Sequence, residues 1–242
     1  MSFLKKVYWT LPHDLRRRAY RYIHPSAYRE LNDLRDAVID QPNSLSFKPF
    51  VDNKCIFVHI PKCAGISVCH SLFGCNAGSH KTIKEYSVAF SAEEFNEFFK
   101  FTIVRNPWDR LLSAYRFLKQ GGRNGFDKQW SEAHLAQYED FRTFVMEGLD
   151  KSEILAWQHF RPQADFITDG SGRIPLDFIG RFESINEDFL TITSNLNKEV
   201  SLQVINKTRG EKIAYHKAYD KEMIEKVSLI YQKDIALLKY QF

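Results

Sequence analysis

One short segment of the sequence carries a lysine, a glycine and a serine in the pattern Pro61-Lys-Cys-Ala-Gly-Ile-Ser67. The apolar run before it predicts a buried strand over residues 55–60, and the residues after it predict a helix over 66–73. A tight turn between a strand and a helix points backbone N–H groups, the helix N-terminus and the lysine ammonium at one small volume. The segment therefore predicts a site that holds a phosphate or sulfate group.

A second segment, Arg105-Asn-Pro-Trp-Asp-Arg-Leu-Leu-Ser113, has related chemistry. Arg105 follows a predicted buried strand (101–104), and ligand groups gather at such strand ends in open parallel sheets. Asn106 and Pro107 are typical of the N-cap and first position of a helix, which carries Ser113 two turns later. On its own the segment could be only a capped helix start. Together with the first loop, Arg105 and Ser113 predict a second phosphate clamp, and thus a ligand with two phosphate-like groups.

The elements around these two segments alternate between strand and helix. A third strand is predicted over residues 176–181. Further helices are predicted from the capping box Ser91–Glu94, over about 131–147, from a second capping box Ser184–Glu187 to about 197, and over about 220–238. This alternation favours the α/β class, with a parallel sheet covered by helices on both faces.

The N-terminal part of the chain differs in composition from the rest. The protein has 242 residues, 44% of them hydrophobic, and a net charge of +4, which is enough chain for one sizeable core. Residues 1–50 form a basic arm interleaved with aromatic residues, and residues 51–242 form the predicted domain. Such an arm could contact an anionic membrane or an acidic glycan, or could be a solvated helical arm packed on the domain. Nucleic acid is disfavoured because the body of the protein is not basic.

The cysteines and the apolar runs bear on where the protein works. No run is long enough to span a bilayer, and no signal peptide is recognisable near Met1. The four cysteines form no Cys-x-x-Cys pair, which argues against a zinc site and favours reduced thiols. We therefore expect a cytoplasmic protein without a metal, with the arm allowing peripheral attachment to the inner membrane face. The sequence does not indicate an oligomeric state.

The two segments together resemble the motifs of a known protein family. His59-Ile-Pro-Lys-Cys-Ala-Gly-Ile-Ser67 resembles the 5′-phosphosulfate loop of sulfotransferases that use 3′-phosphoadenosine 5′-phosphosulfate (PAPS). Arg105 to Tyr115 is similar to the 3′-phosphate motif of carbohydrate sulfotransferases, in particular bacterial members related to heparan-sulfate uronyl sulfotransferases. Phe178–Glu183 and Tyr231–Tyr240 also match that group. The resemblance implies a P-loop-like parallel sheet flanked by helices. It further implies transfer of the sulfuryl group of PAPS to a hydroxyl of a saccharide or glycan, by direct in-line displacement without a metal.

The resemblance also implies a role for each matching residue. Lys62 would touch the oxygen that bridges phosphate and sulfate, where charge develops as the nucleotide leaves. The backbone of Cys63, Ala64, Gly65, Ile66 and Ser67, with the Ser67 hydroxyl, would hold the 5′-phosphate, and Arg105 and Ser113 the 3′-phosphate. Lys207 and Arg209, in a basic turn before the last helix, would contact phosphate or an acidic sugar, unless that turn is only a solvated loop.

The loop departs from the commoner Lys-Thr-Gly-Gly-Thr-Ser form at Cys63, Ala64 and Ile66. The first two substitutions keep the backbone donors. Ile66 lacks a hydroxyl that would bond the 5′-phosphate, a loss of about 1 kcal/mol in affinity.

Sulfuryl transfer to an alcohol needs a base that takes the hydroxyl proton. His80 is the favoured candidate, because related sulfotransferases carry a histidine after the first helix and a pKa near 6.5 leaves histidine largely neutral at cellular pH. His59, on the first strand, is a rival that more readily satisfies a buried hydrogen bond. His159, in a His-x-x-Pro-Gln stretch, is another rival and could line the acceptor pocket or pack a loop.

Two other classes of function stay open at this point. The first is a nucleotide kinase-like P-loop phosphotransferase, against which stands the absence of a Gly-x-x-x-x-Gly-Lys-[Ser/Thr] segment and of a strand-end carboxylate for magnesium. The second is a non-catalytic glycan- or membrane-binding relative. The presence of Lys62, Arg105 and Ser113 argues against such a loss of turnover.

Overall fold

The computed structural model describes residues 3–41, 43–205 and 214–242. These residues divide into two compact units. Unit 1 comprises the described residues of Met1–Ile60, Ala64–Val104 and Asp165–Ile205, and unit 2 those of Pro61–Cys63, Arg105–Ala164 and Asn206–Phe242. The boundary between an arm at 1–50 and a domain at 51–242 stays a prediction.

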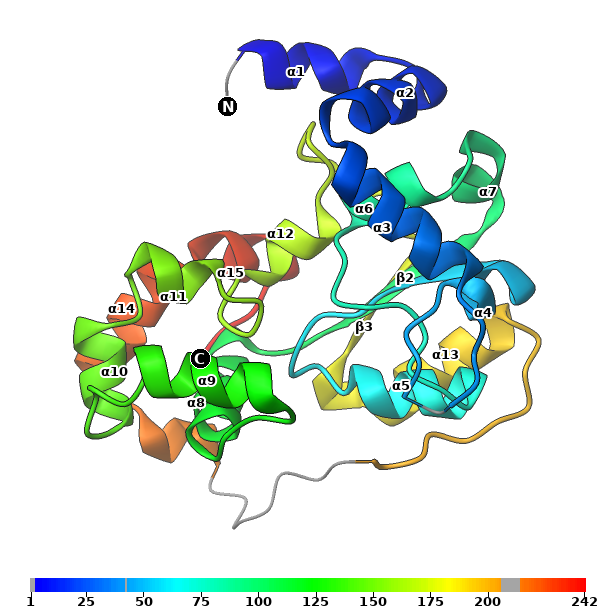
Figure 1. Cartoon of the computed structure of the whole chain (residues 1–242). Helices are drawn as coiled ribbons and strands as arrows, with labels where there is room; N and C mark the ends of the chain where they lie inside the picture. The colour runs from blue at the N-terminus through cyan, green and yellow to red at the C-terminus, as the bar shows by residue number, and fades with distance from the viewer. Residues whose placement is uncertain (1–2, 42, 206–213) are drawn as a thin grey trace. The chain divides into compact units, whose positions relative to one another are not determined.

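Unit 1 is built on a parallel sheet of three strands in the order β1-β2-β3 (Figure 1). The strands are β1 (Cys55–Val58), β2 (Phe99–Val104) and β3 (Phe178–Arg181). All four residues of β1 are buried, which is typical of a strand covered on both faces. The expected α/β class with a parallel sheet flanked by helices is therefore confirmed, and each strand lies within two residues of its predicted bounds.

The helices of unit 1 pack around this sheet and on one another. They are α1 (Phe3–Thr10), α2 (His13–Ile23), α3 (Pro25–Asp36), α4 (Lys48–Asp52), α5 (Gly65–Phe73), α6 (Ile83–Ala89), α7 (Ala92–Glu97) and α13 (Ile185–Asn195). The helix α13 lies against β2 and β3, and α4 lies against β1. The predicted capping box at Ser91 and Glu94 is confirmed at the start of α7, where each side chain bonds the other residue's backbone N–H.

The basic arm is helical and packs on unit 1. Leu31 of α3 is buried, and Arg35 forms an ion pair with Glu94. Arg17 of α2 donates to the carbonyl of Val88 at 2.8 Å. These residues of the arm thus pack on the rest of unit 1, while contact of the arm with a membrane or an acidic glycan stays a prediction.

Unit 2 is helical, with a core of its own. Its helices are α8 (Pro107–Lys119), α9 (Gly125–His134), α10 (Phe141–Glu147), α11 (Ser152–Ala156), α14 (Lys221–Ile230) and α15 (Gln232–Leu238), and the short α12 (Gln163–Ile167) is divided between the units. Trp108, Phe144, Phe160 and Tyr231 are among the buried side chains of this core. The predicted N-cap at Asn106 is confirmed, since its side chain accepts from the N–H of Trp108.

Three predicted helix features are wrong in detail. The helix expected over 131–147 is two helices, because Asp140 caps a new start by accepting from the N–H of Thr143. The helix expected over 220–238 is interrupted at Tyr231, whose hydroxyl donates to the buried carbonyl of Phe160.

The capping box expected at Ser184 and Glu187 is absent from the described contacts of α13. The Ser184 hydroxyl instead donates to Asp188 at 2.7 Å, and the N–H of Arg181 donates to the same carboxylate. A single turn of 3₁₀-helix (Phe182–Ser184) therefore leads into α13.

Candidate functional site

The loop between β1 and α5 has an unusual backbone. Lys62 and Ala64 both have positive φ, +70° and +60°. A left-handed conformation costs a residue with a Cβ about 1–2 kcal/mol, so the surrounding contacts must hold the loop in place. The helix α5 begins at Gly65, and helix geometry leaves the first N–H groups of α5 without intrahelical partners. The predicted helix is thus confirmed, and its start offers backbone donors to an anion.

Gly65 makes room for a histidine. A Cβ built on Gly65 would lie 1.9 Å from Cδ2 of His59, so only glycine fits there without moving the ring. The ring of His59 in turn lies edge-on to the ring of His80, with 4.5 Å between centroids. Unit 1 therefore brings together His80 and its rival His59, both half-buried.

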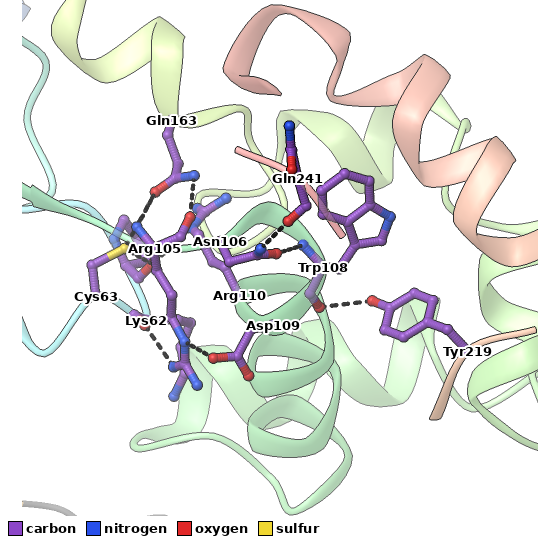
Figure 2. A network of polar contacts seen from close by, with 11 residues as sticks. Lys62, Cys63, Arg105, Asn106, Trp108, Asp109, Arg110, Gln163, Tyr219 and Gln241 are labelled. Atoms are coloured by element: carbon purple, nitrogen blue, oxygen red, sulfur yellow. Dashed lines mark hydrogen bonds and ion pairs between the residues drawn. The ribbon is translucent and has the colours of Figure 1, made fainter. Parts of the chain in front are cut away.

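Three side chains of unit 2 form hydrogen bonds with Pro61, Lys62 and Cys63, the first residues of the loop (Figure 2). Arg110 donates through Nε to the carbonyl of Pro61 at 3.0 Å. Arg105 donates through Nη1 to the carbonyl of Lys62 at 3.0 Å, and Cys63 Sγ lies 3.5 Å from Oε1 of Gln163. The left-handed backbone of Lys62 is therefore fixed by hydrogen bonds on both sides.

The side chain of Lys62 lies in a poorly solvated place. Its Nζ is 3.9 Å from the centroid of the Phe117 ring, a cation–π contact. Burial, together with the positive charges of Arg105 and Arg110, lowers the pKa of Lys62 to about 8, while Asp127 acts in the opposite direction. Adjacent cations that repel each other in a dry place favour the binding of an anion, which relieves the repulsion.

Arg105 is held through its backbone as well as its side chain. Its N–H donates to Oε1 of Gln163 at 2.9 Å, and Nε2 of Gln163 donates back to its carbonyl at 2.8 Å (Figure 2). Its Nε donates to Asp109 at 2.8 Å. The N–H groups of Gln163 and Ala164 both donate to the carboxylate of Asp234, which is fully buried. Burial raises the pKa of Asp234.

Gln163, Asp234 and Arg110 were not predicted to hold these loops. Gln163 and Asp234 do lie in segments that carry the family resemblance, but their partners are backbone atoms far away in sequence, which no motif names. Arg110 lies inside the second motif, and its burial next to Pro61 is set by tertiary structure.

Ser113 and Trp108 both lie on α8. Ser113 is half-buried, two turns after the strand end that carries Arg105. Trp108 is buried in the core of unit 2, and its carbonyl accepts from the hydroxyl of Tyr219 at 2.7 Å. Trp108 therefore supports the start of α8.

The predicted hydroxyl of Ser67 is engaged by another part of unit 1. It donates to the carbonyl of Ile205 at 3.1 Å and accepts from the N–H of Ile205 at 3.0 Å. One turn later, the Ser71 hydroxyl accepts from the N–H of Gln203. Residues 203–205 are thus fastened along α5. Lys207 and Arg209, predicted to contact phosphate or an acidic sugar, lie outside the described residues.

The remaining histidine rival, His159, is buried in unit 2. Its Nδ1 lies 4.0 Å from Oδ1 of Asp127, and its ring packs on Phe117, the ring that also contacts Lys62. This arrangement makes His159 and Asp127 part of the surroundings of Lys62.

The described residues contain neither a cluster of metal ligands nor a helix suited to cross a membrane. Within residues 3–41, 43–205 and 214–242, no group of three or more histidine, cysteine or acidic side chains is arranged to hold a metal ion. In the same part of the chain, no helix has the length and apolar character that crossing a membrane requires. All four cysteines are buried, and none of them forms a disulfide.

Comparison with models of known protein families gives a match over most of the chain. The model of the family described as "Sulfotransferase family" matches residues 50–241. A search of the curated proteins finds no match.

Proposed function

Because the chain belongs to the sulfotransferase family, we propose that it transfers the sulfuryl group of PAPS to a hydroxyl of a saccharide or glycan. The observation that carries the donor assignment is the junction of Lys62 and Arg105 in unit 2. Two cationic residues are joined there by a hydrogen bond, and the ammonium of Lys62 is buried enough to lower its pKa. A ligand with several negative charges, such as PAPS, relieves this repulsion.

Each phosphate has proposed partners. The 5′-phosphate is held by the backbone N–H groups of residues 63–67. Ser67 contributes its hydroxyl. This hydroxyl can keep accepting from the N–H of Ile205 while its own proton is donated to the phosphate. Arg105 and Ser113 hold the 3′-phosphate. Lys207 and Arg209 complete the proposed set.

The proposed reaction is a single in-line displacement. The acceptor hydroxyl gives its proton to His80 as its oxygen forms a bond to sulfur, and the bond between sulfur and the bridging oxygen breaks. The leaving adenosine 3′,5′-bisphosphate takes the electron pair, and the ammonium of Lys62 stabilises the charge that develops on the bridging oxygen. No metal takes part in this scheme.

The ring contact with His59 supports His80 as the base. It holds the His80 ring in a defined orientation, and it leaves His80 half-buried, so that its ring can reach a substrate. His159 is fully enclosed, which disfavours it as a base for an incoming hydroxyl.

The acceptor and the location are further parts of the proposal. We expect a saccharide or glycan acceptor, and a cytoplasmic protein whose basic arm can contact the inner membrane face. Arg18 and Arg21 of α2 are exposed beside Tyr22 and Ile23, which is a suitable composition for an anionic surface.

A transfer assay tests this function. Labelled PAPS is incubated with the enzyme and a panel of glycans, and label in the glycan fraction is measured for wild type, Lys62→Ala and His80→Ala. We expect transfer by wild type and a loss of at least about 100-fold in each variant. Lys48→Ala and His24→Ala, both at exposed positions, are the matched controls and should retain activity.

Binding is measured separately from turnover. Adenosine 3′,5′-bisphosphate should raise the melting temperature of wild type, because a ligand that binds only the folded state stabilises it. No stabilisation at millimolar bisphosphate would refute the donor assignment. Stabilisation without transfer to any glycan would instead identify a binding protein that lacks turnover.

A further inference from the structure

Unit 1 contains a cavity that the proposed reaction does not use. Its volume is about 330 Å³, and its walls come from the arm, from α6 and α7, and from the loop before β3 (elements in Figure 1). The lining residues that matter to the argument are Trp9, His13, Arg16, Phe95, Asp169 and Arg173. This volume is at the small end of the range for ligand pockets.

The cavity lies at the opposite edge of the sheet from the proposed donor loop. The helix α7 ends just before β2 begins, and residues 169–175 precede β3. The loop that leads into α5 follows the carboxyl end of β1. Because the three strands are parallel, residues before a strand and residues after a strand lie at opposite edges. A ligand in this cavity would therefore not compete with a nucleotide bound at the start of α5.

His13 is the polar group that this cavity leaves unsatisfied. Both of its ring nitrogens are buried, and neither has a hydrogen-bond partner among the described residues. The nearest carboxylate oxygen, on Asp14, is 4.0 Å from Nδ1, and the ring packs on Phe95. A buried polar atom without a partner destabilises the protein, so a ligand that supplies the partner gains affinity.

The charges around the cavity favour an anion. Arg16 lies over the ring of Trp9, 4.9 Å from its centroid, and Arg173 is largely exposed at the rim. The carboxylate of Asp169 is engaged in its own loop, where Oδ1 accepts from the N–H and hydroxyl of Ser171 and from the N–H of Arg173. Arg173 is paired with Asp169, whose Oδ2 lies 3.4 Å from its Nη2, so the positive charge that attracts an anion to this cavity comes from Arg16.

Much of the remaining wall is apolar. Ile83, Phe95, Ile174 and Pro175 line it together with Trp9, and Ser87 and Asn96 add two polar side chains. A fully polar ligand would leave this surface unused, whereas a ring-sized apolar body would cover it.

From this arrangement we infer that the cavity is a second binding site, for a small organic anion whose carboxylate accepts from His13 and faces Arg16, and whose apolar ring lies between Phe95 and Ile174. Its occupant touches α1 and α2 on one side and α6 and α7 on the other. Binding would thus fasten the arm to the body of unit 1. The inference does not depend on the proposed transfer reaction.

Calorimetric titration with benzoate tests the site in the full-length protein. Benzyl alcohol serves as the matched neutral ring, and glucuronate as an anion with a polar body. We expect benzoate to bind with a Kd in the range of about 0.1–5 mM, and both other probes to bind at least about fivefold more weakly. Equal binding of benzyl alcohol would refute the anion assignment, and tighter binding of glucuronate would refute the apolar body.

Variants of the cavity residues test whether benzoate binds in this cavity. His13→Phe keeps a ring against Phe95 but removes the donor, and Arg16→Gln removes the cation; each should weaken benzoate binding at least about fivefold. Arg18→Gln, at an exposed position of α2 outside the cavity, is the matched control and should bind like wild type. Should His13→Phe fail to fold, Arg16→Gln decides.

Two results would overturn the inference. One is benzoate affinity that is unchanged in Arg16→Gln, or absent from wild type at 20-fold the highest expected Kd. The other is displacement of benzoate by saturating adenosine 3′,5′-bisphosphate, which would place the probe at the donor site instead.

Discussion

The pKa of Lys62 makes a quantitative prediction for binding of adenosine 3′,5′-bisphosphate. With a pKa of about 8 in the free protein, Lys62 is about 90% protonated at pH 7 and about 10% protonated at pH 9. Only the ammonium form attracts the phosphate. The cause of the low pKa is mainly burial, with a further contribution from Arg105, so the ligand-free protein pays to keep this charge.

The expected result is a Kd that is nearly constant between pH 7 and 7.5 and rises about tenfold per pH unit above 8, equivalent to about 1.4 kcal/mol per unit. The phosphates of the ligand are almost fully ionised above pH 7.5, because their second pKa lies near 6, so the rise above pH 8 does not come from the ligand. Calorimetric titration between pH 6.5 and 9.5 measures the effect without an acceptor. Affinity is thus present below the pKa of Lys62 and lost as the pH rises through it.

Lys62→Arg is the control for this experiment. Arginine stays charged over the whole range, so its Kd should not rise between pH 8 and 9.5, even if its affinity at pH 7 is lower. A wild-type Kd that stays flat to pH 9.5 would show that Lys62 does not titrate near 8 or does not touch the ligand. An identical rise in wild type and Lys62→Arg would assign it to another group.

Further predictions concern the same loop. Asp127→Asn removes a charge that raises the pKa of Lys62, so the midpoint of the binding titration should move to lower pH; a move to higher pH would contradict the electrostatic argument. Lys62→Met removes a buried charge whose pKa is lowered from 10.5 to about 8. Urea denaturation at pH 7 should therefore show a free energy of unfolding that is higher by up to about 3 kcal/mol, while bisphosphate binding is abolished. Lower stability would contradict the burial of the ammonium. Gly65→Ala should cost about 1–3 kcal/mol because its Cβ meets the His59 ring, whereas Gly125→Ala, which has open space at the start of α9, should cost almost nothing; equal effects would show that the ring is free to move. Gln163→Leu removes the two hydrogen bonds between the Gln163 side chain and the backbone of Arg105 and should cost about 2–4 kcal/mol, against almost none for the exposed Gln129→Leu.

Much of the fold could be predicted because its signals are local. The buried run at Cys55–Val58 predicts a strand from four adjacent residues, and Ser91 with Glu94 predicts a helix start from a spacing of three. The same capping pattern at Ser184 and Glu187 failed, because the neighbouring Asp188 offered a carboxylate to Ser184 and to the backbone of Arg181. Choosing between Glu187 and Asp188 requires knowing how the strand enters the helix, which the pattern does not contain.

In the candidate site, too, some residues could be predicted from local signals, whereas the contacts that hold them could not. Lys62, Gly65 and Arg105 are recognisable because a turn and a strand end constrain residue types locally. The contacts that hold them are not recognisable in this way, since Gln163 bonds the backbone of Arg105, and Asp234 bonds the backbone of Gln163. A side chain that bonds a backbone atom does not require a particular residue type at the position it bonds. The interruption at Tyr231 was missed for a related reason: the bond from its hydroxyl to Phe160 outweighs the helical pattern on either side.

The different positions of Lys62 and Arg105 in the hydrogen-bond network have an evolutionary consequence. Arg105 bonds the carbonyl of Lys62 and is gripped by Gln163, so a chain selected only to stay folded would retain it. The ammonium of Lys62 is costly to bury, so the same chain would gain by exchanging it for an apolar residue. A descendant that had lost turnover would therefore keep the arginine and drop the lysine, and that pair of residues would mark the inactive branches of such a lineage.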